Sequence, residues 1–212
     1  MPIRQSLICW KDVEEYSQQE AANLRSGRGV ALASAFSHAI AALSIGTCFY
    51  RPAIPKQVWA AGVLCSVIPD LDVIGFRFGI HYGDFWGHRG FTHSLLFAAL
   101  LAGIVSFALL REGLPRASWF WIWSYLFLAA ASHGLLDAMT DGGLGVAFFS
   151  PFDNQRYFLP WRPIHVAPIG IGRFFTTRGI AVVESELLWI WVPAAVLGIS
   201  AWLLRRPRAL SD

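Results

Sequence analysis

Histidine and aspartate residues recur in this sequence at spacings that suit metal binding. The stretch SHGLLDA places His133 and Asp137 four residues apart, so a helix would carry both side chains on one face. The stretch IPDLD places Asp70 and Asp72 two residues apart, and in an extended or turning segment both carboxylates would point the same way. Two carboxylates in an apolar setting repel each other unless a cation lies between them. These two motifs predict a shared metal site.

A third motif, GHRGFTHSLL over residues 87–96, adds two imidazoles and a cation. His88 and His93 are five residues apart with Gly90 between them, so they do not share one helical face. We expect His88 in a loop and His93 in the first turn of the helix that follows. Arg89 is suited to an anionic group or to orienting a carboxylate. His38, in SHAIAALSIG, completes the donor set from an earlier segment.

Imidazoles mixed with carboxylates suit Zn²⁺, Mn²⁺ or Fe²⁺, whereas Ca²⁺ and Mg²⁺ prefer oxygen ligands. The donors exceed the needs of one tetrahedral ion, so a pair of ions about 3.5–4 Å apart is favoured over one. Zinc is the favoured metal. The chemistry would be hydrolysis, most simply of a phosphoester. Asp72 is the predicted water-activating base or bridging ligand, and Arg89 is predicted to orient a ligand or to stabilise developing negative charge. The predicted metal ligands are His38, Asp70, Asp72, His88, His93, His133 and Asp137.

The elements that must position these residues are apolar helices. Of the 212 residues, 55% are hydrophobic and only 15% are charged, against about 25% charged in a soluble domain. A membrane span needs roughly 20 apolar residues. Four segments qualify, and a shorter one at 58–69 either extends past Pro69 to about Gly75 or forms a half-span. The five segments are about 30–50, 58–69, 91–110, 118–139 and 187–204.

The sequence therefore predicts an all-α integral membrane bundle with about five spans and a long irregular connection over 141–186. Residues 1–29 are expected to form a soluble or interfacial extension, and residues 30–212 the membrane-embedded domain. If the spans alternate, all seven candidate ligands fall near one face of the membrane. His81 and His165 are interpreted as loop histidines, and Arg156 as an interfacial cation.

Partners follow from charge and depth. A net charge of +3 without a basic patch speaks against nucleic acid as a partner. A site just below the membrane surface meets head groups first, so membrane lipids or other amphiphiles are the expected substrates.

Four stretches together resemble a known family. SHAIAALSIG, IPDLDVIGF, GHRGFTHSLL and SHGLLDAMTDGGLGVAFFSPF follow in this order over roughly residues 30–160. They are similar to the YdjM-type family of inner-membrane metal-dependent hydrolases, which is typified by an H near the first span, P-D-x-D, HRGxTHS and SHxxxDxxT. The resemblance implies a metal-dependent hydrolase in the bacterial inner membrane whose natural substrate is generally unknown. The family's usual Pro and Trp after DxxTxxG are absent here.

Two other functions use the same donors. A divalent-metal transporter or sensor would need a polar route to the opposite face, and the far halves of the spans contain few polar residues. A catalytically inactive membrane scaffold would keep one ion for folding alone. The scarcity of polar residues there favours hydrolysis over transport, and the paired carboxylates favour it over the scaffold.

Overall fold

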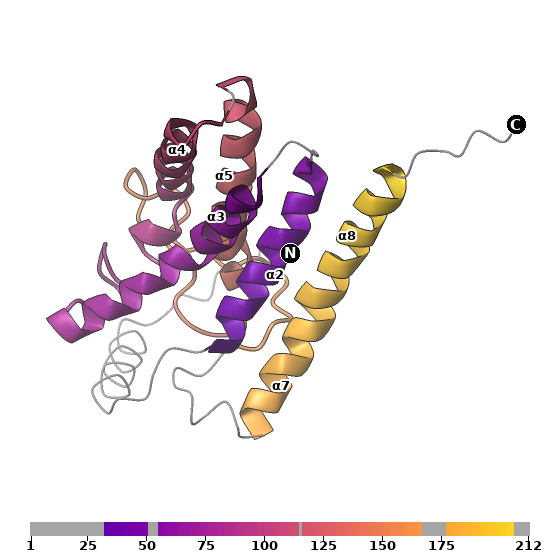
Figure 1. Ribbon diagram of the computed structural model, residues 1–212. Coiled ribbons are helices and arrows are strands. Elements are labelled where there is room, and N and C mark those ends of the chain that lie inside the picture. The colour runs from indigo at the N-terminus through magenta and orange to yellow at the C-terminus, as the bar shows by residue number, and fades with distance from the viewer. Residues whose placement is uncertain (1–31, 51–54, 115, 167–176, 206–212) are drawn as a thin grey trace, which may run out of the picture.

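The computed structural model describes residues 32–50, 55–114, 116–166 and 177–205, and within them the chain is helical apart from loops and isolated bridges (Figure 1). The predicted all-helical architecture is confirmed for this part of the chain, while the predicted extension over residues 1–29 lies outside it. The main helices are α2 (Leu32–Phe49), α3 (Lys56–Val67), α4 (Leu95–Arg111), α5 (Trp119–Ala138), α7 (Thr177–Glu186) and α8 (Val192–Arg205).

Helix α5 lies at the centre and packs against α2, α3 and α4 (Figure 1). The core between them consists of small and branched side chains, among them Ala42, Cys65, Ala102 and Leu126. A Cβ atom at Gly62 would overlap the ring of Tyr125, so glycine is what lets α3 approach α5 this closely. Small residues at helix contacts are typical of membrane bundles, where close backbone approach replaces the hydrophobic driving force.

The second apolar segment extends past Pro69, the first of the two sequence alternatives, and its helical run reaches Phe78. After α3 the chain continues as a 3₁₀ helix, η1 (Ile68–Phe78), giving one helical run of 23 residues over Lys56–Phe78. Pro69 stands in the first turn of η1, where its missing N–H and fixed φ are tolerated. The expected extended or turning conformation around Asp70 and Asp72 is therefore wrong, because both residues lie in η1.

The last helical run begins earlier than predicted. α7 starts at Thr177, so the irregular connection ends there and does not reach residue 186. α7 passes into a short π-helical turn, η4 (Leu187–Trp191), and then into α8. Together they form one long rod along α2 at the edge of the molecule (Figure 1).

Two described helical runs, Lys56–Phe78 and Gly179–Arg205, are long and apolar enough to cross a membrane. The apolar helices over Ala35–Phe49 and Leu95–Arg111 are shorter. The membrane bundle therefore holds in outline, and the count of five spans stays a prediction.

Two loops meet at the C-terminal end of α5. The first, residues 79–94, contains a short 3₁₀ turn, η2 (Phe91–His93). The second follows α5 and is held by isolated bridges between Thr140 and Ile164 and between Val146 and Tyr157. A small apolar cluster of Val73, Phe76, Tyr82 and Leu144 joins both loops to η1. These contacts bring the sequence motifs together at one end of the bundle.

Candidate metal centre

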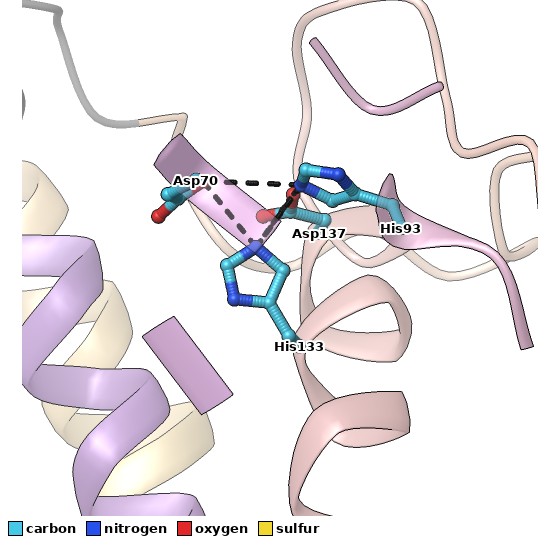
Figure 2. Close-up of side chains that lie close together, drawn as sticks. All are labelled: Asp70, His93, His133 and Asp137. Carbon is cyan, nitrogen blue, oxygen red and sulfur yellow. Dashed lines mark hydrogen bonds and ion pairs between the residues drawn. The ribbon is translucent and has the colours of Figure 1, made fainter. Parts of the chain in front are cut away.

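Four of the predicted ligands converge at this end of the bundle (Figure 2). His133 and Asp137 come from α5, Asp70 from η1 and His93 from η2. The Nε2 atoms of His93 and His133 are 3.0 Å apart. Asp137 Oδ2 lies 3.2 Å from His93 Nε2 and 3.6 Å from His133 Nε2. Asp70 Oδ1 lies 3.3 Å from His133 Nε2 and 3.8 Å from His93 Nε2.

In His93 and His133, the contact made by Nδ1 determines whether Nε2 carries a proton or a lone pair. His133 Nδ1 lies 2.7 Å from the carbonyl oxygen of Ser66, which can only accept, so Nδ1 carries the proton. His93 Nδ1 lies 3.1 Å from Thr92 Oγ1, which donates its own proton to Asp72 and so accepts from the ring, and 3.2 Å from the same Asp72 oxygen. With each Nδ1 protonated, the two Nε2 atoms face each other and two carboxylate oxygens. A divalent cation bound between these four atoms would satisfy them together.

The separations between donor atoms fit one ion. A tetrahedral ion with bonds of about 2.0–2.2 Å separates its ligand atoms by roughly 3.3–3.6 Å. The measured separations of 3.0–3.8 Å bracket this range. Within the described residues, the buried Asp137 Oδ2 also lacks a well-directed hydrogen bond, as expected of an oxygen reserved for a cation. Asp70, His93, His133 and Asp137 could therefore hold a divalent transition metal.

Local backbone chemistry explains the placement of the two histidines. In a 3₁₀ helix the N–H of a residue bonds the carbonyl three residues earlier, and Pro69 has no N–H to offer Ser66. The Ser66 carbonyl instead orients His133. His93 precedes α4, whose N-cap is Ser94, so the expectation that His93 lies in the first turn of that helix is wrong by two residues.

Gly134 was not singled out from the sequence, although it sets the distance between η2 and α5. A Cβ atom there would lie 2.9 Å from the carbonyl oxygen of His93. A glycine inside an apolar helix is the only signal the sequence carries for this contact.

Asp72 and His88 lie together on the far side of the His93 ring. The Asp72 side chain is buried and accepts from Thr92 Oγ1 at 2.7 Å, and its other oxygen lies 2.8 Å from His88 Nδ1. Burial disfavours the charged imidazole of His88, but the carboxylate of Asp72 outweighs burial and raises the pKa of His88 above its usual value. Asp72, His88 and His93 form a second group with metal-binding spacing.

Arg89 is buried and binds the C-terminal end of α5. Its Nε lies 3.2 Å from Asp137 Oδ2, and its Nη1 donates to Thr140 Oγ1 at 3.0 Å and to the carbonyl of Gly142 at 2.9 Å. The backbone of Arg89 adopts φ +62°, a strained value for a residue with a Cβ. This geometry suits the orienting role expected of Arg89, because its Nε contacts the same Asp137 oxygen that faces His93 and His133.

His38 lies beside the four donors without joining them. Its ring stacks on that of His133 with centroids 3.8 Å apart, and its Nε2 lies 3.8 Å from Asp137 Oδ1. Within the described chain its buried Nδ1 has no hydrogen-bond partner. His38 therefore faces the Asp137 oxygen that points away from the other donors.

The remaining candidates pair up outside the cluster. His81 lies 3.5 Å from Asp84, and His165 lies 2.7 Å from Asp141, with all four side chains exposed. Arg156 differs from the expected interfacial cation, since it turns inward. It donates to the carbonyl oxygens of His88 at 2.7 Å and of Tyr82 at 2.9 Å, and so ties the two loops together. Because its acceptors are backbone atoms, no side-chain pattern in the sequence could reveal this role.

Comparison with known proteins agrees with the motifs. Residues 34–208 match the family described as YdjM inner membrane protein. The chain belongs to the YdjM inner membrane protein family. It is 40% identical over 173 residues to the inner membrane protein YbcI of Escherichia coli strain K12, covering 80% of this chain and 97% of YbcI.

A second relative is more distant. The chain is 31% identical over 107 residues to the uncharacterized protein YvsG of Bacillus subtilis strain 168, covering 47% of this chain and 62% of YvsG. No solved structure matches the chain. Membership in the YdjM family places the protein in the inner membrane and agrees with the two long apolar helical runs.

Proposed function

We propose that this protein is a membrane-embedded metal-dependent hydrolase that cleaves an ester or phosphoester of a lipid or another amphiphile. The observation that carries the proposal is the convergence of two Nε2 atoms and two carboxylate oxygens, all within 4.8 Å of one another and with the five separations that involve a nitrogen at 3.0–3.8 Å. Both imidazoles are oriented by acceptors on their outer nitrogens, as is usual for metal-ligating histidines.

The donor chemistry favours Zn²⁺, with Mn²⁺ or Fe²⁺ as alternatives, because nitrogen and oxygen donors are mixed. A divalent ion of this kind supplies Lewis acidity and a nucleophilic water at neutral pH. The protein would supply orientation: Asp72 holds His93, Ser66 holds His133, and Arg89 holds Asp137. The Asp70 side chain is 17% exposed against 9% or less for the other three, so the cluster opens toward substrate beside Asp70.

The number of ions remains a prediction. Asp72, His88 and His93 have the spacing of a second site, as a binuclear centre requires. However, His93 could serve both sites only by giving up its Nδ1 proton, which Thr92 Oγ1 at 3.1 Å and the Asp72 carboxylate at 3.2 Å stabilise. We therefore propose one ion, bound by Asp70, His93, His133 and Asp137. Asp72 then acts on His93 and is neither a ligand nor the base.

One observation favours a second function, a structural metal in an inactive scaffold. Four protein donors complete the shell of a tetrahedral ion, as in structural zinc sites. Against this stand the opening at Asp70 and the ability of Zn²⁺, Mn²⁺ and Fe²⁺ to take a fifth ligand. A transporter is less well supported, because the described bundle beyond the cluster is filled by the apolar core around Leu126 and Ala129.

Metal content and hydrolysis together test the proposal. We would measure zinc, manganese and iron per chain by mass spectrometry in detergent-purified wild type and in His133→Ala/Asp137→Ala. The matched control is His165→Ala/Asp141→Ala, which removes an exposed His–Asp pair outside the cluster. We expect about one ion in the wild type and the control and none in the cluster variant.

Hydrolysis of p-nitrophenyl alkyl phosphates should follow the metal in the same three proteins. Metal loss confined to the cluster variant, with no hydrolysis by any of them, would support the structural role instead. Absence of metal from folded wild type, even after reconstitution with Zn²⁺, would refute both.

A further inference from the structure

Helices α3 and η1 form one run that crosses α2 at an angle (Figure 1). The outer side of this run is apolar. Leu64 on α3 is 62% exposed, and Leu71 and Ile74 on η1 are 56% and 50% exposed. Residues three apart lie above one another in a 3₁₀ helix, so Leu71, Ile74 and Arg77 share one face of η1. We call the side chains of Leu64, Leu71 and Ile74 the outer stripe.

The metal centre lies on a neighbouring face of the same helix. Val73 and Phe76 follow Asp70 at intervals of three residues and are both buried, so their face of η1 points into the protein. Leu71 is the next residue after Asp70, and the two Cα atoms are about 3.8 Å apart. No other residue stands between Asp70 and Leu71 in the chain. The donor set therefore borders the outer stripe at Asp70.

The other three donors are enclosed by the protein. The side chains of His93 and His133 are fully buried, and that of Asp137 is nearly so. Arg89, itself buried, contacts Asp137 from the loop that precedes α4. Asp70 is the most exposed of the four donors. A substrate therefore reaches the donors beside Asp70, next to the outer stripe.

The environment of the outer stripe follows from the length and charge of the run. The protein belongs to an inner-membrane family, and Lys56–Phe78 is long and apolar enough to cross a membrane. Between Lys56 and Arg77 the only charged residues are Asp70 and Asp72. These two cations are about 36 Å apart along the run, against about 30 Å for the hydrocarbon core, so a tilted run places one in each head-group layer. The outer stripe between them then contacts lipid chains.

Arg77 sets the direction in which a lipid lies against this surface. Arg77 is exposed, and a long cationic side chain at the end of an apolar stripe extends to the head-group phosphates. Asp70 lies seven residues earlier, about 14 Å along η1, and Leu64 lies beyond it toward the membrane interior. A lipid beside the run has its head group near Arg77 and its chains near Leu64. The bonds that join the two parts then pass Asp70.

We propose that a membrane-dissolved amphiphile enters the metal centre sideways from the bilayer, with a hydrocarbon chain against the outer stripe and its ester or phosphoester beside Asp70. This inference rests on the proposed function and adds the route of entry and the orientation of the substrate. Leucine and isoleucine side chains offer no hydrogen bonds, so a hydrocarbon chain loses nothing against them, whereas a hydrated substrate would lose its water. Long-chain esters are therefore favoured over short, water-soluble ones.

The environment of Leu71 can be measured without activity. A nitroxide is attached at Leu71→Cys, Val196→Cys or Asp84→Cys in phospholipid nanodiscs, in a background that keeps only the buried Cys65. Val196 is exposed on the last apolar run, and Asp84 is exposed in the loop after η1. Power saturation compares collisions with oxygen, which concentrates in hydrocarbon, and with a water-soluble nickel chelate. We expect an oxygen-to-nickel ratio at Leu71 within twofold of that at Val196 and at least fivefold above that at Asp84. A ratio at Leu71 close to that at Asp84 would place the opening in water and overturn the proposal.

Kinetics then test whether the substrate passes Leu71. Leu71→Trp adds bulk at the opening, and Leu100→Trp is the matched control on α4, where Leu100 is similarly exposed. For p-nitrophenyl dodecyl phosphate against p-nitrophenyl ethyl phosphate, we expect the ratio of kcat/KM values to fall at least fivefold in Leu71→Trp and to stay constant in Leu100→Trp, with about one bound ion in each. An unchanged ratio in Leu71→Trp, or an equal fall in the control, would refute lateral entry. If folded wild type binds metal but hydrolyses neither ester, the proposed function fails and the substrate assignment fails with it, while the nitroxide ratios still show whether η1 faces lipid.

Discussion

Replacing Asp72 with asparagine tests whether Asp72 binds the metal itself or only orients the ligand His93. One oxygen of Asp72 lies 3.2 Å from His93 Nδ1 and accepts from Thr92 Oγ1 at 2.7 Å, and its second oxygen lies 2.8 Å from His88 Nδ1. Asparagine keeps the shape but exchanges one acceptor oxygen for an NH₂ group, which cannot accept from an imidazole N–H. The His93 ring would lose the contact that fixes its tautomer and direction.

The expected size of the effect follows from where Asp72 lies. Loss of a partner behind a ligating histidine weakens metal binding by about 10–100-fold, or about 1.4–2.7 kcal/mol. A residue that binds the metal directly contributes more binding free energy than a residue that orients a ligand. If the roughly 10–16 kcal/mol of a four-ligand zinc site is shared evenly, each ligand contributes about 2.5–4 kcal/mol, or roughly 10²–10³-fold. Asp70→Ala should therefore weaken binding about tenfold more than Asp72→Asn.

Competition against a chelator of known affinity measures both zinc dissociation constants, and mass spectrometry on the same samples counts ions per chain. We expect a ratio of one for wild type and for Asp72→Asn at saturating zinc. A fall from two ions to one in Asp72→Asn would show that Asp72 ligates a second ion and would refute our reasoning. A dissociation constant within twofold of wild type would show that the hydrogen bond to His93 does not matter.

Two further predictions concern the loop after α5. Gly143 and Gly113 both have positive φ, but a Cβ atom at Gly143 would lie 2.7 Å from Arg89 Nη1, whereas at Gly113 it would meet nothing within 4 Å. Thermal unfolding in detergent should therefore show a loss of about 1–2 kcal/mol for Gly113→Ala and roughly 1–3 kcal/mol more for Gly143→Ala, and equal losses would contradict the close contact. Partial burial disfavours ionised Asp141, but hydrogen bonds from His165 and from the Val166 N–H outweigh burial and hold the pKa of Asp141 below its usual value. The contribution of ionised Asp141 to stability is then fully present above about pH 4, and it is lost as pH falls through the lowered pKa. Asp141→Ala should therefore speed hydrogen exchange at the Val166 amide at pH 5 and at pH 7 alike. Faster exchange at only one of these pH values would contradict the lowered pKa.

Residue type and spacing were enough to predict which side chains could donate to a metal. His133 and Asp137 share a helical face in any α-helix, and so the sequence sufficed to pair them. The apolar runs sufficed to predict helices, because a segment such as LLFAALLAGIVSFALL can satisfy its backbone in an apolar setting only by hydrogen bonding within itself. Local conformation was less predictable around Pro69, where 3₁₀ and extended geometries both suit an isolated PDLD.

By itself, the sequence determined that this is a helical membrane protein with His and Asp residues suited to binding a metal, since hydropathy and ligand chemistry are properties of residues. Only the tertiary structure decided which of these donors lie together. Asp70 and Asp72 look equivalent in IPDLD, yet one faces Nε2 of His93 and the other Nδ1. That difference arises because η1, η2 and α5 meet at angles set by the contacts of Gly134, Ser66 and Arg89 with other segments. Such contacts join residues far apart in the chain, and no local pattern encodes them.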